Sequence, residues 1–183
     1  MSYKKRSRKI TPTRRIMILR HAKSSWQDDS LADFDRPLAP RGRRAAAVVG
    51  AYLRDERLIP SVVLCSPARR AIETWERVAP FLGITVPVRA ERDLYVADPK
   101  MLLQRLQRLE NDISSVMVVG HHTSIDVLAV RLAGAGKRPD LERMRDKFPT
   151  AALAVIDAKL DDWADLSKGA GTLRNFVVPK ELV

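Results

Sequence analysis

The sequence contains a single cysteine, Cys65, among its 183 residues. One thiol cannot form an internal disulfide, which excludes a disulfide-stapled secreted scaffold, and we expect a cytoplasmic protein. The longest apolar runs are only a handful of residues long, and no apolar stretch follows the charged N-terminus. Neither a membrane-spanning helix nor a signal peptide fits such a pattern, so we expect no membrane association.

Acidic residues are missing from residues 1–15, where seven cations lie in a short polar segment without periodicity. Most of the formal net charge of +11 is therefore concentrated there. We expect a basic, disordered arm over 1–13 and a single domain over 14–183. An arm that tethers nucleic acid or anionic lipid is the alternative. No aromatic residues interleave with helical basic positions, and no zinc-knuckle or helix-turn-helix spacing occurs, so nucleic acid is not an expected partner.

The rest of the chain alternates short apolar runs with amphipathic stretches, which favours an α/β fold with a largely parallel sheet covered on both faces. Two predicted helices begin at residues typical of helix starts, Pro67 and Thr123, and Gly83 ends one of them. We find no repeat or linker that would mark a second domain. The predicted strands span 15–19, 61–66, 84–90, 115–120, 151–157 and 172–179, and the predicted helices span 42–56, 68–82, 99–110 and 123–134.

Three of the predicted buried strands end in polar residues that suit an anion. Ligands of open α/β sheets bind outside the carboxyl ends of the strands, so these residues are expected to meet there. Arginines offer planar charge-assisted donors, and helix N-termini offer free amide groups, which together suit a phosphoryl group. All three histidines of the chain are among these residues, which are Arg20, His21, Ser66, Arg70, His121 and His122.

Each of these residues also has a simpler interpretation. A strand-end histidine is more often structural than catalytic, and an arginine early in a helix is usually solvated. Three histidines could bind zinc, but the adjacent His121 and His122 lack the i, i+4 spacing of helical ligand pairs, so no metal is expected. A cysteine phosphatase would need an arginine where Ala71 stands, six positions after Cys65.

Five segments resemble the histidine phosphatase superfamily, the phosphoglycerate-mutase-like fold, and most closely its short phosphohistidine phosphatase SixA branch. The resemblance covers about residues 14–183 and implies a three-layer α/β/α sandwich with a mostly parallel central sheet. Its opening Arg-His-Gly is Arg20-His21-Ala22 here, with alanine in place of glycine. The segments are RHAKSSW (20–26), DRPLAPRG (35–42), SPARRAIET (66–74), VVGHHTSI (118–125) and VVPKELV (177–183).

The resemblance implies that His21 attacks phosphorus and forms a covalent phosphohistidine intermediate, which water then hydrolyses. Arg20, Arg70 and His121 would bind the phosphoryl oxygens and stabilise charge in the transition state. Gln27 and His122 stand where relatives carry other substrate contacts. No metal or organic cofactor is implied.

Larger relatives also use a carboxylic acid to protonate the leaving oxygen, and Glu91 is the candidate here, although no distinct motif surrounds it. Since a protonated imidazole leaves readily without such an acid, the weak signal favours a phosphohistidine protein as the substrate. The short chain between Arg70 and His121 also leaves little room for a lid. The alternatives are a phosphomonoesterase acting on a sugar or nucleotide phosphate, and a non-catalytic phosphate-binding or adaptor module.

Overall fold

A seven-stranded sheet forms the centre of the protein, whose computed structural model describes residues 11–182. Most of the predicted basic arm, residues 1–10, lies outside the described residues. The strands follow the order β3-β2-β4-β1-β6-β7-β5 across the sheet, and all neighbours are parallel except the two pairs that β6 makes. They are β1 (Thr13–Arg20), β2 (Val62–Cys65), β3 (Val88–Ala90), β4 (Ser115–Gly120), β5 (Ala133–Gly136), β6 (Leu153–Lys159) and β7 (Gly171–Val177).

Side chains of β1 alternate between two apolar cores, one on each face of the sheet. Ile16 and Ile18 point to one core, and Met17 and Leu19 point to the other, all without exposed surface. A strand buried on both faces needs such an uninterrupted apolar run, which is why β1 lies in the middle of the sheet. The three-layer α/β/α architecture predicted from the sequence is confirmed.

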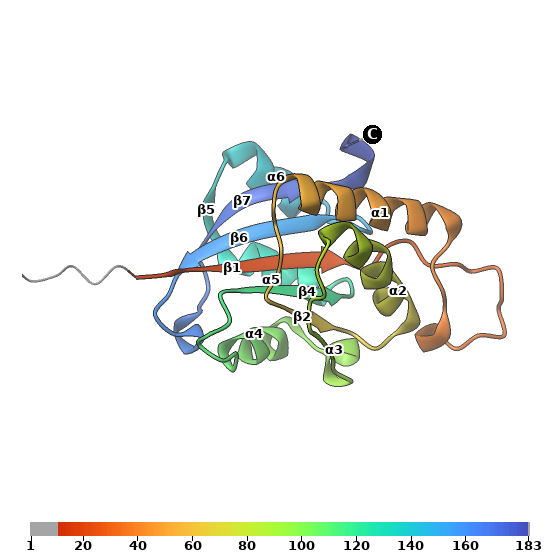
Figure 1. Ribbon diagram of the computed structural model, residues 1–183, viewed down its shortest axis with the longest axis horizontal. Coiled ribbons are helices and arrows are strands. Elements are labelled where there is room, and N and C mark those ends of the chain that lie inside the picture. The colour runs from red at the N-terminus through yellow and green to blue at the C-terminus, as the bar shows by residue number, and fades with distance from the viewer. Residues whose placement is uncertain (1–10, 183) are drawn as a thin grey trace, which may run out of the picture.

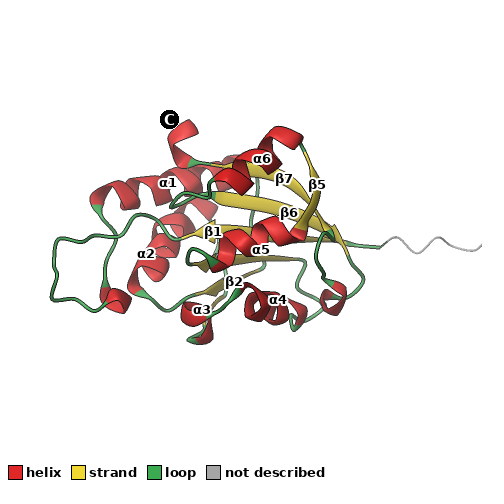
Figure 2. Ribbon diagram, turned by 180° about the vertical axis from the view of Figure 1, so that it is seen from behind, coloured by secondary structure: helices red, strands yellow, loops and turns green. Residues whose placement is uncertain are grey.

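Helices cover both faces of the sheet. The helices α1 and α2 pack on one face (Figure 1), and α4, α5 and α6 lie on the other (Figure 2). No helix in residues 11–182 has the length and apolar character needed to cross a bilayer. The helices are α1 (Pro40–Asp55), α2 (Arg69–Val78), the single turn α3 (Asp93–Val96), α4 (Pro99–Gln107), α5 (Ser124–Leu132) and α6 (Arg138–Asp146).

Several elements differ from the sequence prediction. The predicted strand 84–90 is reduced to the three residues of β3, whose ladder begins just after Pro87, a residue that lacks a backbone N–H to donate. The predicted helix 68–82 changes into a 3-10 turn at Ala79–Leu82, which contains Pro80. The elements β5 and α6 were not expected, because β5 is made of glycine and alanine and α6 buries only Met144.

The first strand also begins earlier than predicted, and it includes Arg14 and Arg15, two of the seven cations near the N-terminus. The Arg14 guanidinium is buried and donates hydrogen bonds to the carbonyl oxygens of Asn111 and Ile113. Arg15 forms a two-point ion pair with Asp157 of β6. These two charges therefore hold the sheet together and do not belong to a free arm.

Candidate active site

The parallel register of β1 and β4 brings two histidines together at the carboxyl edge of the sheet. Arg20 is paired with Gly120, so the next residue of each strand, His21 and His121, leaves the sheet at the same level. The amide of His21 donates to the carbonyl of Gly120 at 3.0 Å, and the two imidazole centroids lie 5.1 Å apart. Residues 100 positions apart in the sequence therefore form one cluster.

The ring of His21 has a fixed orientation and tautomer. Its Nδ1 lies 2.8 Å from the carbonyl oxygen of Ala22, which can only accept, so Nδ1 carries the proton and Nε2 keeps its lone pair. The amide of Ala22 donates in turn to the hydroxyl of Thr74, and that hydroxyl donates to the carbonyl of Arg70 in α2. These hydrogen bonds hold the loop after β1 against α2. They also fix Nε2 as the nitrogen of His21 that carries the free lone pair.

Both histidines are neutral at physiological pH. Burial lowers the pKa of His21 to about 3, with smaller contributions from His121, Arg70 and Arg20, although the Ala22 carbonyl acts in the opposite direction. Burial, followed by the charge of Arg70, lowers the pKa of His121 to about 4. A neutral imidazole with a free Nε2 is the form that can act as a nucleophile.

Three arginines line the same strand-end cavity as His21, a hollow of about 210 Å³, and two of them, Arg20 and Arg70, were expected at the site. Arg20, the last residue of β1, donates from Nη1 to the carbonyl of Phe148 at 2.7 Å. Arg70 lies in the first turn of α2, with only 9% of its side chain exposed. Because protein contacts hold the guanidinium groups of Arg20 and Arg70, these groups are arranged in advance for an anion. The lining residues are Arg20, His21, Lys23, Ser24, Trp26, Asp33, Arg36, Arg70 and Thr150.

Two nitrogen atoms at this site are buried without a hydrogen-bond partner among residues 11–182, namely Nε of Arg20 and Nδ1 of His121. The other ring nitrogen of His121, Nε2, lies 2.7 Å from the hydroxyl of Ser66, the residue after β2. Buried polar atoms are rarely left unpaired, and such atoms beside a polar cavity are suited to a bound anion. No group of three or more metal-ligating side chains occurs in the described part of the chain.

Asp33 is a residue of this site that the sequence did not indicate. Its backbone carbonyl accepts from Arg70 Nη1 at 2.5 Å, and its carboxylate accepts from Arg70 Nη2 and from the Tyr95 hydroxyl, each at 2.9 Å. Burial alone would raise the pKa of Asp33, but the hydrogen bonds from Tyr95 and Arg70 outweigh it and hold the pKa below its usual value. The ionised carboxylate of Asp33 is therefore bound to Arg70, the arginine that a phosphoryl group would need.

The loop that carries Asp33 is anchored by Arg36, which is buried although it is an arginine in a long polar segment. Arg36 donates to the carbonyl of Ser25, to the hydroxyl of Ser24 and to the carboxylate of Asp33. Its guanidinium also covers the ring of Trp26, 3.1 Å from the centroid. This anchoring gives a structural role to Arg36, the first of the two arginines in the DRPLAPRG segment.

Gln27 follows this stacked pair but is exposed and does not line the strand-end cavity. Its backbone amide donates to the hydroxyl of Ser25. The structure therefore does not bring Gln27 together with His21 and the arginines.

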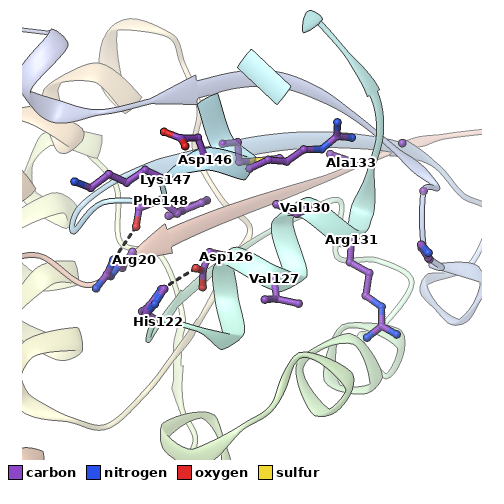
Figure 3. A pocket seen from close by; sticks show the side chains of 15 residues that line it. Arg20, His122, Asp126, Val127, Val130, Arg131, Ala133, Asp146, Lys147 and Phe148 are labelled. Carbon is purple, nitrogen blue, oxygen red and sulfur yellow. Dashed lines mark hydrogen bonds and ion pairs between the residues drawn. The ribbon is translucent and has the colours of Figure 1, made fainter. Parts of the chain in front are cut away.

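His122 lines a second and broader hollow of about 900 Å³, which meets the strand-end cavity at Arg20 (Figure 3). Its Nδ1 lies 2.7 Å from the carboxylate of Asp126, one turn further along α5, and about half of its side chain is exposed. His122 therefore does not line the strand-end cavity, and its ring contacts a carboxylate in the broad hollow.

Glu91 is placed outside the strand-end cavity. Both of its carboxylate oxygens accept from Arg105 of α4, at 2.7 and 2.6 Å, and it lines a separate hollow with Leu94 and Met101. Its carboxylate is therefore engaged by Arg105 and does not line the cavity that contains His21. The structure thus gives no support for Glu91 as the general acid.

Cys65, the only thiol of the chain, is buried at the end of β2. Burial raises the pKa of this thiol to about 12, so the thiolate that a cysteine phosphatase requires is disfavoured.

Comparison with known families gives a match between residues 16–95 and the family described as the histidine phosphatase superfamily, branch 1. An uncharacterized protein of Mycobacterium tuberculosis is 38% identical over 164 residues, which covers 88% of this chain and all of that protein. The phosphohistidine phosphatase SixA of Escherichia coli strain K12 is 27% identical over 143 residues, covering 77% of this chain and 83% of SixA.

Solved structures agree with these sequence matches. One from Nakamurella multipartitia, assigned as the phosphohistidine phosphatase SixA, superposes with a TM-score of 0.81 and 28% identity over 93% of this chain and 99% of its own. A phosphoglycerate mutase from Plasmodium falciparum superposes with a TM-score of 0.59 at 15% identity, covering 90% of this chain and 91% of its own, which shows the shared fold alone.

Proposed function

This chain belongs to the histidine phosphatase superfamily, and on that premise we propose that it hydrolyses phosphohistidine on a protein substrate through a covalent intermediate on His21. The observation that carries the proposal is the hydrogen bond from His21 Nδ1 to the Ala22 carbonyl, which leaves Nε2 free beside two arginines. A non-catalytic phosphate-binding module would need the arginines but not a histidine with a fixed tautomer.

In the first step, the Nε2 lone pair of His21 attacks phosphorus, and the bond from phosphorus to the substrate imidazole breaks. That imidazole leaves as a neutral ring if its second nitrogen already carries a proton. The ring of His21, now bearing phosphorus on Nε2 and a proton on Nδ1, becomes positively charged, and the Ala22 carbonyl stabilises that charge. Water then attacks phosphorus, the bond to Nε2 breaks, and inorganic phosphate leaves.

Arg20 and Arg70 act as the phosphoryl clamp in this proposal, with His121 donating one N–H to the same group. Phosphoryl transfer is accelerated mainly by positioning and by charge stabilisation, so fixed cations contribute most of the effect. Asp33 competes with the phosphoryl group for Arg70, and binding requires its carboxylate to move or to share the guanidinium.

Two carboxyl groups that could act as the general acid are engaged in ion pairs, which supports phosphohistidine as the substrate. Glu91 is paired with Arg105, and Asp33 is held ionised by Arg70 and Tyr95. An alkoxide leaving group needs a proton donor, whereas a protonated imidazole does not. The name of the SixA relative from Escherichia coli points to the same substrate class.

The test is a turnover comparison between a phosphohistidine-bearing carrier protein and small phosphate esters such as sugar and nucleotide phosphates. We expect faster hydrolysis of the phosphorylated protein by the wild-type enzyme, and loss of that hydrolysis in His21→Ala, with unfolding curves as the control for folding. Efficient cleavage of a small ester together with an untouched carrier protein would instead favour the small-molecule phosphomonoesterase. Full activity of His21→Ala would overturn the mechanism.

A further inference from the structure

A third hollow, of about 500 Å³, adjoins the strand-end cavity and is lined by cations without any acidic side chain. We refer to it as the basic hollow. Its cations are Arg20, Lys23, Arg41, Lys147 and Lys180. It shares Arg20, Lys23 and Thr150 with the strand-end cavity, so a molecule bound at His21 reaches it directly.

Four distant chain segments are fastened together to form the basic hollow. Lys23 follows β1, and its carbonyl accepts from the amide of Ala39, just before α1. A Cβ on Gly42 would lie 2.2 Å from that same carbonyl, so glycine is what lets the first turn of α1 approach Lys23 so closely. The C-terminal turn that carries Lys180 packs beside α1 (Figure 1).

The positive charges of the basic hollow are not balanced by neighbouring acids. Within residues 11–182, the side chains of Lys23, Arg41, Lys147 and Lys180 form no ion pair. Some surface cations elsewhere are paired, as Arg138 is with Glu142 and Arg69 is with Glu73. Glu181, which directly follows Lys180, is paired with Arg143 on α6.

Like charges gathered in one place repel one another and create a positive potential that a bound anion relieves. The first turn of α1 adds to this potential, because it contains no acidic residue and its free amides are partly positive. By contrast, the broad hollow on the other side of Arg20 includes Asp126 and Asp146 among its lining. The broad hollow therefore has two acids against its five cations, whereas the basic hollow has five cations and no acid, so the excess of positive charge is larger in the basic hollow.

We infer that the basic hollow binds acidic side chains of a protein substrate whose phosphohistidine occupies the strand-end cavity. This inference rests on the proposed function. Three of the cations are lysines, whose ammonium groups end flexible stems and act as point charges, unlike the rigid fork of an arginine that matches one fixed anion. With an apolar floor of Ala45, Val178 and Pro179, the hollow suits aspartate and glutamate side chains of an adjoining peptide.

The experiment compares two phosphohistidine peptides that differ only in flanking residues, glutamate in one and glutamine in the other. The test variant is Arg41→Gln/Lys180→Gln, because neither residue lines the strand-end cavity. The matched control is Arg54→Gln/Arg138→Gln, which removes two exposed cations located elsewhere.

We expect the wild-type enzyme and the control to prefer the glutamate peptide by about tenfold in kcat/KM at low salt, mainly through KM. The test variant should lose this preference while it hydrolyses the glutamine peptide at the wild-type rate. Raising the salt from about 0.05 to about 0.5 M should weaken the preference of the wild-type enzyme, because exposed charges are screened.

Each other outcome separates the inference from the proposed function. Equal turnover of the two peptides by the wild-type enzyme would overturn the inference and leave the proposed function standing. Turnover of neither peptide, with hydrolysis of phosphate esters, would overturn the proposed function and with it the protein substrate. If only a bisphosphorylated small ester lost turnover in the test variant, the hollow would bind a second phosphate and the inference would be wrong.

Discussion

The two halves of the sheet contribute to the candidate active site in different ways. The parallel half, β2, β4 and β1, ends in the side chains that carry the chemistry. The other half, where β6 runs antiparallel, meets the site mainly through its backbone. The carbonyl of Phe148 holds Arg20, and the amide of Ala151 donates to the carbonyl of Arg20. Substitutions in the first half should therefore affect mainly kcat, whereas substitutions in the second half, apart from the lysines of the basic hollow, should affect mainly stability.

The largest effect is expected in the parallel half, from Arg70→Ala. Removal of one preorganised donor of a charged transition state lowers kcat by about 10²–10³-fold. Arg70→Lys should be intermediate, because an ammonium keeps the charge but cannot bind two oxygens in one plane. Steady-state kinetics of the folded variants measures both. A variant that retained wild-type kcat would remove Arg70 from the clamp.

The opposite pattern is expected from Phe148→Ala in the other half. Its ring is buried against Phe176, so truncation should lower the free energy of unfolding by about 3–5 kcal/mol. Its carbonyl contact with Arg20 remains, and kcat should change little at temperatures where the variant is folded. Denaturant titration and kinetics together test this. A loss of kcat as large as that of Arg70→Ala in the folded protein would contradict the division between the halves.

Acid should destabilise the protein through the two histidines of the parallel half. Their pKa values in the folded state, about 3 for His21 and about 4 for His121, lie below the ordinary value of 6.5. The unfolded chain therefore binds more protons below pH 6.5, so this stability is fully present above that pH and is lost as the pH falls toward 4.

Each histidine contributes a slope of roughly 1.4 kcal/mol per pH unit within that window. The free energy of unfolding of His21→Gln, measured by denaturant titration from about pH 7 down to 4, should fall less steeply than that of the wild type. Parallel curves would mean that His21 is not held neutral by burial.

The smallest effect is expected from Asp33→Asn, which removes the negative charge that faces Arg70. Half of the Asp33 side chain is exposed, so the gain for a competing anion is modest. The inhibition constant of inorganic phosphate should fall by about two- to fivefold, as is typical for an exposed charge pair. Weaker inhibition by phosphate would contradict this prediction. It would show that Asp33 positions Arg70 for the anion and does not compete with the anion for Arg70.

Strands rich in apolar residues were predicted in both halves of the sheet, and β6 and β7, expected over 151–157 and 172–179, begin and end within two residues of those bounds. Strands β1, β2 and β4 were expected within two residues of their ends, and His21 and His121 follow β1 and β4. The α6 helix has almost no apolar face, and β5 has no β-branched residue, so neither produces a periodic signal.

Asp33 was missed for a different reason. It is one of four aspartates in the polar segment 27–40, and nothing in that pattern distinguishes the one that folds back onto Arg70. The basic hollow likewise gathers Lys23, Arg41, Lys147 and Lys180 from four separate segments, a juxtaposition that only the tertiary structure creates.

The measurement that tests the central claim most directly is to trap the covalent intermediate. The enzyme is mixed with a substrate that carries a labelled phosphoryl group, and the reaction is quenched rapidly in alkali. Peptide mapping then locates the label on the enzyme. We expect an alkali-stable, acid-labile label on His21, because its Nε2 is the free nitrogen in the strand-end cavity. Label on His121 or on a carboxylate, or turnover without label on His21, would contradict the account.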